Sequence, residues 1–214
     1  MSRTKLVFFG GSKGGVGKST ISHLACLGAV LSNQAAAYVL TDPDRKIRDK
    51  GRPYDVFDGT EADGLASLLK AGKDTPSDGW LIVDGGGNRP AFDKEIAKEA
   101  GLCIFPFRPS QEDMDTVSDD MNRIPNALAW PSAWPTNIFA IPSAQSYINR
   151  LSKEFPSRVI TKVIPFVNSA SDLLADSLES PSPPVRRLAR KVFLVMEQQF
   201  ERRSEKPAKR RAAG

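Results

Sequence analysis

The residues best suited to chemistry form a glycine-rich stretch near the start of the chain, GGSKGGVGKST, at residues 10–20. Glycines let backbone N–H groups turn inward toward an anion, because no side chain obstructs the turn. Lys18 can place an ammonium group among phosphate oxygens, and Ser19 can offer a hydroxyl group to Mg²⁺. The stretch therefore predicts a phosphate-binding loop.

The segments on both sides of this loop follow the order that such a loop requires. The apolar run from Leu6 to Phe9 predicts a buried strand, and the apolar spacing from Ile21 to Asn33 predicts a helix. A helix that starts after the loop adds the positive end of its dipole to the anion site. The loop departs from the strict spacing G-x-x-x-x-G-K-[ST] because Ser12 replaces the first glycine, and it contains a second lysine, Lys13.

Two aspartates follow later apolar runs. Asp42 comes after the run at 35–40, and Asp84 closes the run at 80–83. In parallel α/β sheets, ligands bind beyond the carboxyl ends of the strands, so we expect both aspartates at the edge that holds the loop. A carboxylate at a strand end beside a phosphate-binding loop can hold the Mg²⁺ shell, which predicts Ser19 and Asp84 as the metal residues. The alternatives are an ordinary Asp-Pro turn at Asp42 and an ordinary glycine turn after Asp84.

The sequence KGGVGKST at residues 13–20 resembles the deviant Walker A motif, KGGxGK[ST], of the ParA/MinD family of P-loop ATPases. The resemblance implies binding of ATP and Mg²⁺, and a nucleotide-sandwich dimer in which Lys13 reaches the phosphates of the partner. It implies catalytic roles for Lys13, Lys18 and Asp42. The residues that it implies for nucleotide binding are Lys13, Gly14, Gly15, Val16, Gly17, Lys18, Ser19 and Thr20. The alternative for Lys13 is a solvated loop lysine.

The chain departs from that family's D-x-D-P-Q motif. Asp42 matches the second aspartate, which helps to position the attacking water, but Leu40 and Asp44 replace the first aspartate and the glutamine. Because of these two replacements, the sequence does not predict the detailed mechanism or the rate of ATP hydrolysis. The segment at 168–177 resembles the family's adenine-side loop, whereas the family's Asn-Arg pair near the adenine has no counterpart here.

The remaining apolar runs predict an α/β fold with a mostly parallel twisted sheet flanked by helices on both faces. We expect further strands at 54–57, 102–107, 137–141 and 159–165, and helices at 61–70, 91–100, 111–124, 147–155 and 185–200. The four aspartates of the predicted helix at 111–124 indicate a solvated face. We expect one domain at 1–203 and a basic, disordered tail at 204–214.

Charge is concentrated at the end of the chain, which has 214 residues and a net charge of +5. From Arg186 onward there are ten lysines and arginines against three glutamates, so this segment carries +7 and the rest −2. Clustered basic residues bind DNA phosphates, and in the related family basic residues of the last helices contribute to DNA binding. The predicted DNA-binding residues are Arg186, Arg187, Arg190 and Lys191. A solubilising tail is the alternative.

Other features narrow the class of protein. No apolar run approaches the roughly 18 residues of a membrane span, so a cytoplasmic protein without a membrane partner is expected. The two cysteines, Cys26 and Cys103, lack the spacing of a metal or disulfide motif. The single histidine, His23, has no paired nucleophile and is interpreted as a packed side chain.

The resemblance implies a ParA-like ATPase that dimerises on ATP, binds DNA nonspecifically and uses hydrolysis to partition or position a plasmid, chromosome or other cargo. It also implies a small ParB-like adaptor that stimulates hydrolysis, and association with the bacterial nucleoid in the ATP-bound state. Two alternatives remain open: a conjugation or plasmid-stability ATPase of the same superfamily, and a metabolic P-loop enzyme. A MinD-like membrane positioner is disfavoured because residues 204–214 contain no large apolar side chain.

Overall fold

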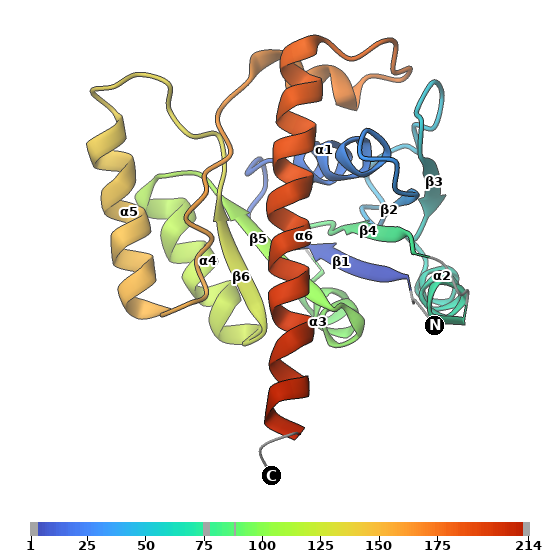
Figure 1. Cartoon of the computed structure of the whole chain (residues 1–214), viewed down its shortest axis with the longest axis horizontal. Coiled ribbons are helices and arrows are strands. Elements are labelled where there is room, and N and C mark those ends of the chain that lie inside the picture. Colours follow the sequence, from blue (N-terminus) through green and yellow to red (C-terminus); the bar gives the residue numbers. More distant parts are fainter. Residues whose placement is uncertain (1–3, 75–77, 88, 212–214) are drawn as a thin grey trace.

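A parallel sheet lies at the centre of the molecule (Figure 1). The computed structural model describes residues 4–74, 78–87 and 89–211. Within these ranges the sheet has six strands in the order β3-β2-β4-β1-β5-β6. The strands are β1 (Lys5–Phe9), β2 (Ala36–Leu40), β3 (Asp55–Asp58), β4 (Trp80–Asp84), β5 (Leu102–Phe107) and β6 (Ala127–Pro131). Strands β4, β5 and β6 are buried along their whole length, as expected when helices cover both faces of a parallel sheet.

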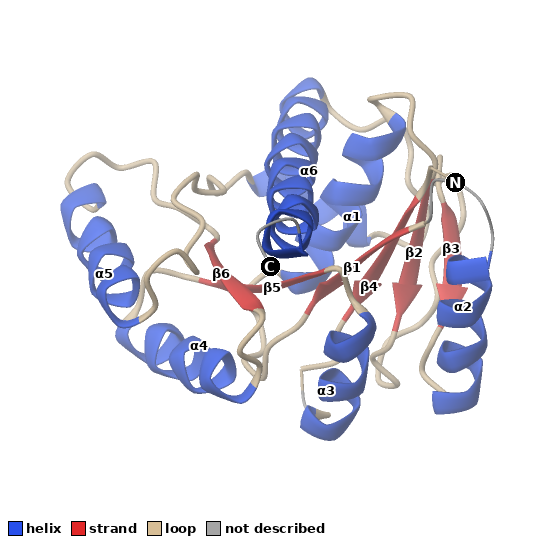
Figure 2. Cartoon of the chain, turned by 60° about the horizontal axis from the view of Figure 1, so that its bottom comes forward, coloured by secondary structure: helices blue, strands red, loops and turns tan. Residues whose placement is uncertain are grey.

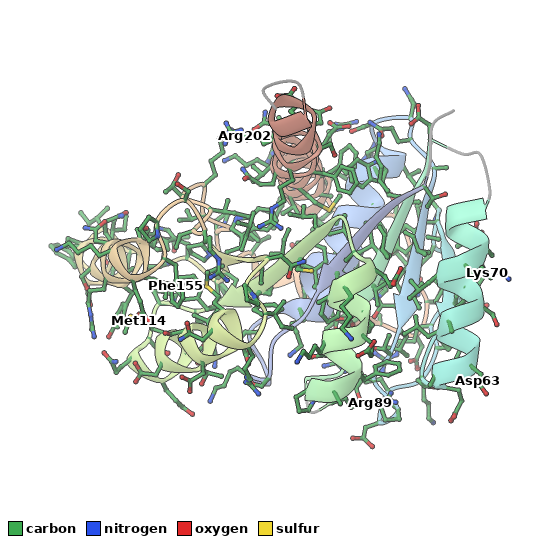
Figure 3. The ribbon with its side chains drawn as sticks, turned by 90° about the horizontal axis from the view of Figure 1, so that it is seen from below. Asp63, Lys70, Arg89, Met114, Phe155 and Arg202 are labelled. Carbon is green, nitrogen blue, oxygen red and sulfur yellow. The ribbon has the colours of Figure 1, made fainter. Side chains whose placement is uncertain are left out.

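Helices cover both faces of the sheet (Figure 2). One face packs against α1 (Lys18–Val30), α6 (Pro183–Arg211) and the short 3₁₀ helix η1 (Asn168–Leu174). The other packs against α2 (Ala62–Asp74), α3 (Pro90–Glu99), α4 (Gln111–Arg123) and α5 (Ile141–Glu154). Side chains of β1 alternate between the two cores, with Val7 and Phe9 in the first and Leu6 and Phe8 in the second. In Figure 3, Arg202 of α6 and Arg89 before α3 accordingly lie on opposite sides of the sheet.

Helices α1 and α6 approach each other closely at Gly28. A Cβ atom at this position would lie 2.2 Å from the carbonyl oxygen of Ala189 and 2.5 Å from the Cβ of Phe193. Further along α6, Phe193 and Phe200 contact the ring of Trp80 edge-on, with centroid distances of 5.3 and 5.4 Å. The long last helix is therefore part of the core.

The predicted α/β class and helices on both faces are confirmed, but the prediction is wrong at the β6 edge. The sixth strand is Ala127–Pro131, and residues 137–140 form a turn before α5 instead of the predicted strand. The apolar side chains that suggested a strand there are exposed, Ile138 by 70% and Phe139 by 85%. The run Ala127–Pro131 is instead buried against β5.

The predicted strand at 159–165 makes only two isolated bridges, at Val159 and Pro165. The amides of Ile160 and Ile164 donate to the carbonyls of Ala129 and Pro131, at 2.9 and 3.0 Å. These two amides are four positions apart, whereas the carbonyls that they contact are two positions apart, so the regular one-to-one pairing of a continuous ladder is not kept.

The end of the chain also differs from the prediction. Helix α6 continues to Arg211, where the sequence predicts disorder from residue 204, and residues 212–214 lie outside the described part. Glutamate, lysine and arginine in this stretch are good helix formers, whereas Pro207 is unfavourable in a helix interior. Across the described ranges, no helix combines the length and apolar character needed to cross a bilayer.

Candidate active site

Three strand ends meet at one level of the sheet. Asp84, the last residue of β4, is in register with Phe9 at the end of β1 and with Leu40 at the end of β2. The glycine-rich loop leaves β1 and Asp42 follows β2, so both emerge beside Asp84. They surround a cavity of about 520 Å³, whose lining includes Ser12, Gly14, Gly15, Gly17, Lys18, Ser19, Thr20, Asp42, Arg45 and residues 85–87.

The loop ends in an anion-binding arrangement. Gly17 precedes α1 with φ 95°, in the left-handed region that favours glycine, and no side chain of the described residues caps the helix. The first-turn amides of α1 are therefore available to a ligand. The Lys18 ammonium is buried and donates to the carbonyl oxygen of Lys13 at 2.7 Å. Burial lowers the pKa of Lys18, and the negative charge of Asp84 opposes this effect.

Two residues that were not predicted to belong to the site anchor the loop. Buried Asp120 of α4 accepts from the Ser12 amide at 2.7 Å and from the Ser12 hydroxyl at 3.0 Å. The buried Ser132 hydroxyl donates to the carbonyl oxygen of Val16 at 2.8 Å. Val16 itself is buried beneath the loop and does not line the cavity.

The acidic face predicted on α4 is only partly solvated. Asp115 and Asp119 are exposed, whereas Asp113 and Asp120 are buried. Asp113 accepts from the backbone amide and from the side chain of Arg108, both at 3.1 Å. The two buried aspartates are seven positions apart, which places them on one helix face, and this spacing was available in the sequence as a signal.

The Asp84 carboxylate is buried and asymmetric. The Tyr38 hydroxyl donates to Oδ2 at 2.6 Å, while the buried Oδ1 finds no hydrogen-bond partner among the described residues. The hydroxyl of Thr41 donates to the Asp84 backbone carbonyl at 2.7 Å and fixes the end of the strand. Burial raises the pKa of Asp84, while the nearby Ser19 and Tyr38 hydroxyls and the positive charges of Arg45 and Lys18 oppose this effect.

An aromatic stack holds Tyr38 in place. The ring of His23 stacks on the ring of Tyr38 with a centroid distance of 4.0 Å, and its Nδ1 lies 2.9 Å from the Tyr54 hydroxyl. Burial, together with the positive charge of Arg52, lowers the pKa of His23 to about 3, so the ring is neutral near pH 7. His23 is a packed residue, as the sequence analysis interpreted it, and it supports the residue that contacts Asp84.

Asp42 lies at the cavity together with an arginine that the sequence analysis did not assign. Its Oδ1 accepts from the amide of Asp44 at 3.1 Å, which forms a local turn, and its Oδ2 lies 3.2 Å from Nε of Arg45. Nη1 of Arg45 donates to the Ser19 hydroxyl at 2.6 Å. Asp42 therefore forms the local turn that was the alternative to a site role, and it also lines the cavity.

The other predicted site residues lie outside this cavity. The ammonium of Lys13 pairs with the carboxylate of Glu112 in α4. The four basic residues predicted to bind DNA are exposed near the start of α6, and none of them lines the cavity: Arg186, Arg187, Arg190 and Lys191.

Comparisons with known proteins reveal similarity in structure. No protein-family model matches the chain, and no curated protein matches it in sequence. Among solved structures, the complex of a McdA variant from Cyanothece with ATP matches with a TM-score of 0.62 and 14% identity, covering 92% of this chain and 98% of that one. The MinD cell division ATPase of Pyrococcus furiosus matches with a TM-score of 0.63 and 14% identity, covering 93% and 100%.

A plasmid partition protein from Borrelia burgdorferi, bound to AMPPNP, matches with a TM-score of 0.58 and 14% identity, covering 90% of this chain and 99% of that one. The chain has the ParA/MinD fold. Within this fold, the loop after β1 and the ends of β2 and β4 meet at one cavity.

Proposed function

We propose that this chain is a magnesium-dependent ATPase of the ParA type. The observation that carries the proposal is the strand register, which brings the glycine-rich loop, Asp42 and Asp84 around one cavity. Structures of the same fold that bind ATP and AMPPNP support a nucleotide as the ligand.

The residues beside the loop fit a magnesium ion. Mg²⁺ prefers oxygen ligands, and Asp84 and Ser19 supply a carboxylate and a hydroxyl group. No residue in the described part of the chain hydrogen-bonds the buried Oδ1 of Asp84, and leaving such an oxygen unsatisfied is costly. A bound cation would satisfy it. When bound, the ion would offset negative charge on the phosphate oxygens.

The proposed reaction is in-line transfer of the terminal phosphoryl group to water. The loop amides and the ammonium of Lys18 would bind the phosphates, with Lys18 exchanging the Lys13 carbonyl for a phosphate oxygen. Asp42 would orient the water. Asp42 lines the cavity, and Leu40 and Asp44 are not among its described lining residues, which supports Asp42 in this role.

The proposed active form is a dimer of two ATP-bound copies. Lys13 pairs with Glu112, whose side chain is 78% exposed, and such surface ion pairs contribute only about 0–1 kcal/mol. Lys13 can therefore leave Glu112 for the phosphates of a partner copy at little cost. The dimer would bind DNA nonspecifically through the basic start of α6, and a small ParB-like adaptor would stimulate hydrolysis. This cycle would partition or position a plasmid, chromosome or other cargo in the bacterial cytoplasm.

Three variants test the proposal. Lys18→Ala should abolish binding of a fluorescent ATP analogue, because it removes the buried ammonium from the cavity. Lys13→Ala, the matched control in the same loop, should retain ATP binding but lose the ATP-dependent dimer in light scattering. Asp42→Ala should bind ATP and stay dimeric without phosphate release.

Micromolar affinity for ATP in Lys18→Ala would refute the assignment of the loop. Turnover that required a small metabolite and did not respond to DNA would instead favour a metabolic P-loop enzyme.

A further inference from the structure

We propose that Arg45 is a further nucleotide-binding residue, one that contacts the terminal phosphate of ATP and lets the site distinguish ATP from ADP. The inference rests on the proposed function and deepens it. Arg45 follows Asp42-Pro43-Asp44 in the loop between β2 and β3. Among the described residues that line the cavity, Lys18 and Arg45 carry the only positively charged side chains.

The loop that carries Arg45 is held firmly at its far side. Nη1 of Arg48 donates to the carbonyl oxygen of Leu174 at 2.6 Å, and Nη2 of Arg52 donates to those of Leu173 and Ala175 at 2.8 and 2.9 Å. These contacts bind the loop to η1, whose Leu174 also lines the cavity. The backbone position of Arg45 is therefore set by its neighbours.

The side chain of Arg45 has room to change partners. Its side chain is 45% exposed, and it contacts Asp42 through Nε and the Ser19 hydroxyl through Nη1. A guanidinium group has five N–H donors, and the hydrogen bond to Ser19 uses one of them. Arg45 can thus contact a phosphate group with donors that its present partners leave unused.

Binding of the nucleotide with its metal would direct this exchange. The Ser19 hydroxyl that now accepts from Arg45 is one of the two groups that fit Mg²⁺. A cation at Ser19 would repel the guanidinium from that hydroxyl group. The nearest anion is then the phosphate chain of the bound nucleotide. A guanidinium group binds phosphate with paired, charge-assisted hydrogen bonds.

The contact between Arg45 and Asp42 indicates which phosphate of the nucleotide Arg45 would bind. Asp42 is the residue proposed to orient water for attack on the terminal phosphate, and Arg45 lies 3.2 Å from its carboxylate. An arginine at this position would therefore contact the group that ATP has and ADP lacks. It would add to Lys18 a second positive charge from the same chain.

The test compares affinities for ATP and ADP in the presence of Mg²⁺, measured with fluorescent analogues of both nucleotides. Arg45→Ala should weaken ATP binding by about tenfold or more and change ADP binding by less than about twofold, as expected when charge-assisted hydrogen bonds to one phosphate are lost. Lys46→Ala is the matched control, since it removes a positive charge from the next residue, which is exposed and does not line the cavity. Lys46→Ala should change neither affinity by more than about twofold.

An equal loss for ATP and ADP, or an unchanged or tighter affinity for ATP in Arg45→Ala, would overturn the proposal and leave Arg45 as a cation that Mg²⁺ displaces. If Arg45→Ala fails to fold, Arg45→Gln makes the same comparison with a neutral side chain of greater length. Failure of the unmodified chain to bind either nucleotide would refute the proposed function itself. If the unmodified chain binds nucleotide and the Arg45 variants distinguish ATP from ADP as well as it does, only the role of Arg45 would be refuted.

Discussion

The two oxygens of the Asp84 carboxylate have different surroundings. Oδ2 accepts from Tyr38, whereas Oδ1 has no hydrogen-bond partner within residues 4–74, 78–87 and 89–211. Tyr38 is held by the stacked ring of His23, which in turn contacts Tyr54. We infer that Tyr38 is a positioning residue, because it orients the carboxylate so that Oδ1 remains available to a cation.

Replacing Tyr38 by phenylalanine removes the hydroxyl and keeps the ring that stacks on His23. A hydrogen bond to a charged group contributes about 1.5–3 kcal/mol, so Tyr38→Phe should raise the Mg²⁺ concentration needed for half-maximal nucleotide binding by about tenfold. Tyr54→Phe is the control, since it removes a hydroxyl that contacts His23 and not Asp84. Identical Mg²⁺ titrations for the two variants would show that Tyr38 has only a packing role.

Asp93 in α3 is a second buried carboxyl group with one oxygen, Oδ1, that no described residue hydrogen-bonds. Burial raises its pKa from 3.8 to about 6, against the opposing charge of Lys18. The unfolded chain ionises this group above about pH 3.8, while the folded protein keeps it protonated until about pH 6. The free energy of unfolding therefore falls as the pH rises between these values and levels off above them.

Asp93→Asn should stabilise the protein by about 2–3 kcal/mol at pH 7.5 and by less at pH 5, where the native carboxyl is largely protonated. Urea unfolding at the two pH values measures the difference. The exposed Asp119 provides the control, and Asp119→Asn should show no such pH dependence. A gain that is equal at both pH values would contradict the raised pKa.

At the scale of elements, the close packing of α1 and α6 holds the helix that follows the glycine-rich loop. Gly28 allows this approach because a Cβ atom would meet the backbone of Ala189 at 2.2 Å. Backbone atoms cannot move aside as the end of a side chain can, so the two helices would have to separate. The α1 face that meets α6 thus depends on one residue without a side chain.

Gly28→Ala should lower the free energy of unfolding by about 1–3 kcal/mol, the usual cost of overpacking. Gly64→Ala is the matched control, because Gly64 lies in α2 and an added Cβ would meet nothing within 4 Å. That variant should gain about 0.5–1 kcal/mol from helix propensity. Denaturant unfolding of both variants measures the two effects, and a stabilised Gly28→Ala would contradict the packing argument.

At the scale of the whole molecule, positive charge lies on the last helix, while the cavity lies where the loop meets the strand ends. The four basic residues at the start of α6 are exposed and spaced so that they share one helix face. This arrangement separates the proposed nucleotide site from the proposed DNA contact, so each can be altered alone.

Replacing Arg186, Arg187, Arg190 and Lys191 together by alanine should weaken nonspecific DNA binding and reduce the slope of log K against log salt by up to about 3–4, since each phosphate contact contributes about 0.9. Fluorescence anisotropy with a labelled duplex at several salt concentrations measures the slope. Removal of residues 204–214 is the comparison, and a larger effect from that truncation would assign the contact to the end of α6. ATP binding should be unchanged in both variants.

The glycine-rich loop and its two aspartates could be recognised from the sequence because their signals are local. The motif at 13–20 lies between a strand and a helix, and Asp42 and Asp84 directly follow apolar runs. A parallel sheet gathers such strand ends at one edge, so local pattern and general topology were enough to predict which residues meet there. The same local reasoning was wrong at the β6 edge. The exposed run at 137–140 and the buried strand at 127–131 are both mostly apolar, and local pattern did not distinguish them.

The residues that support and complete the site were decided by the tertiary structure alone. Tyr38 and Asp84 are 46 positions apart, and Ser12 and Asp120 are 108 apart. Arg45 lies near Ser19 only because β2 ends and α1 begins beside the same cavity. Hydrogen bonds act over about 3 Å, so the way in which the helices pack on the sheet decides which distant polar groups meet. The spacing of residues along the chain does not indicate these pairs.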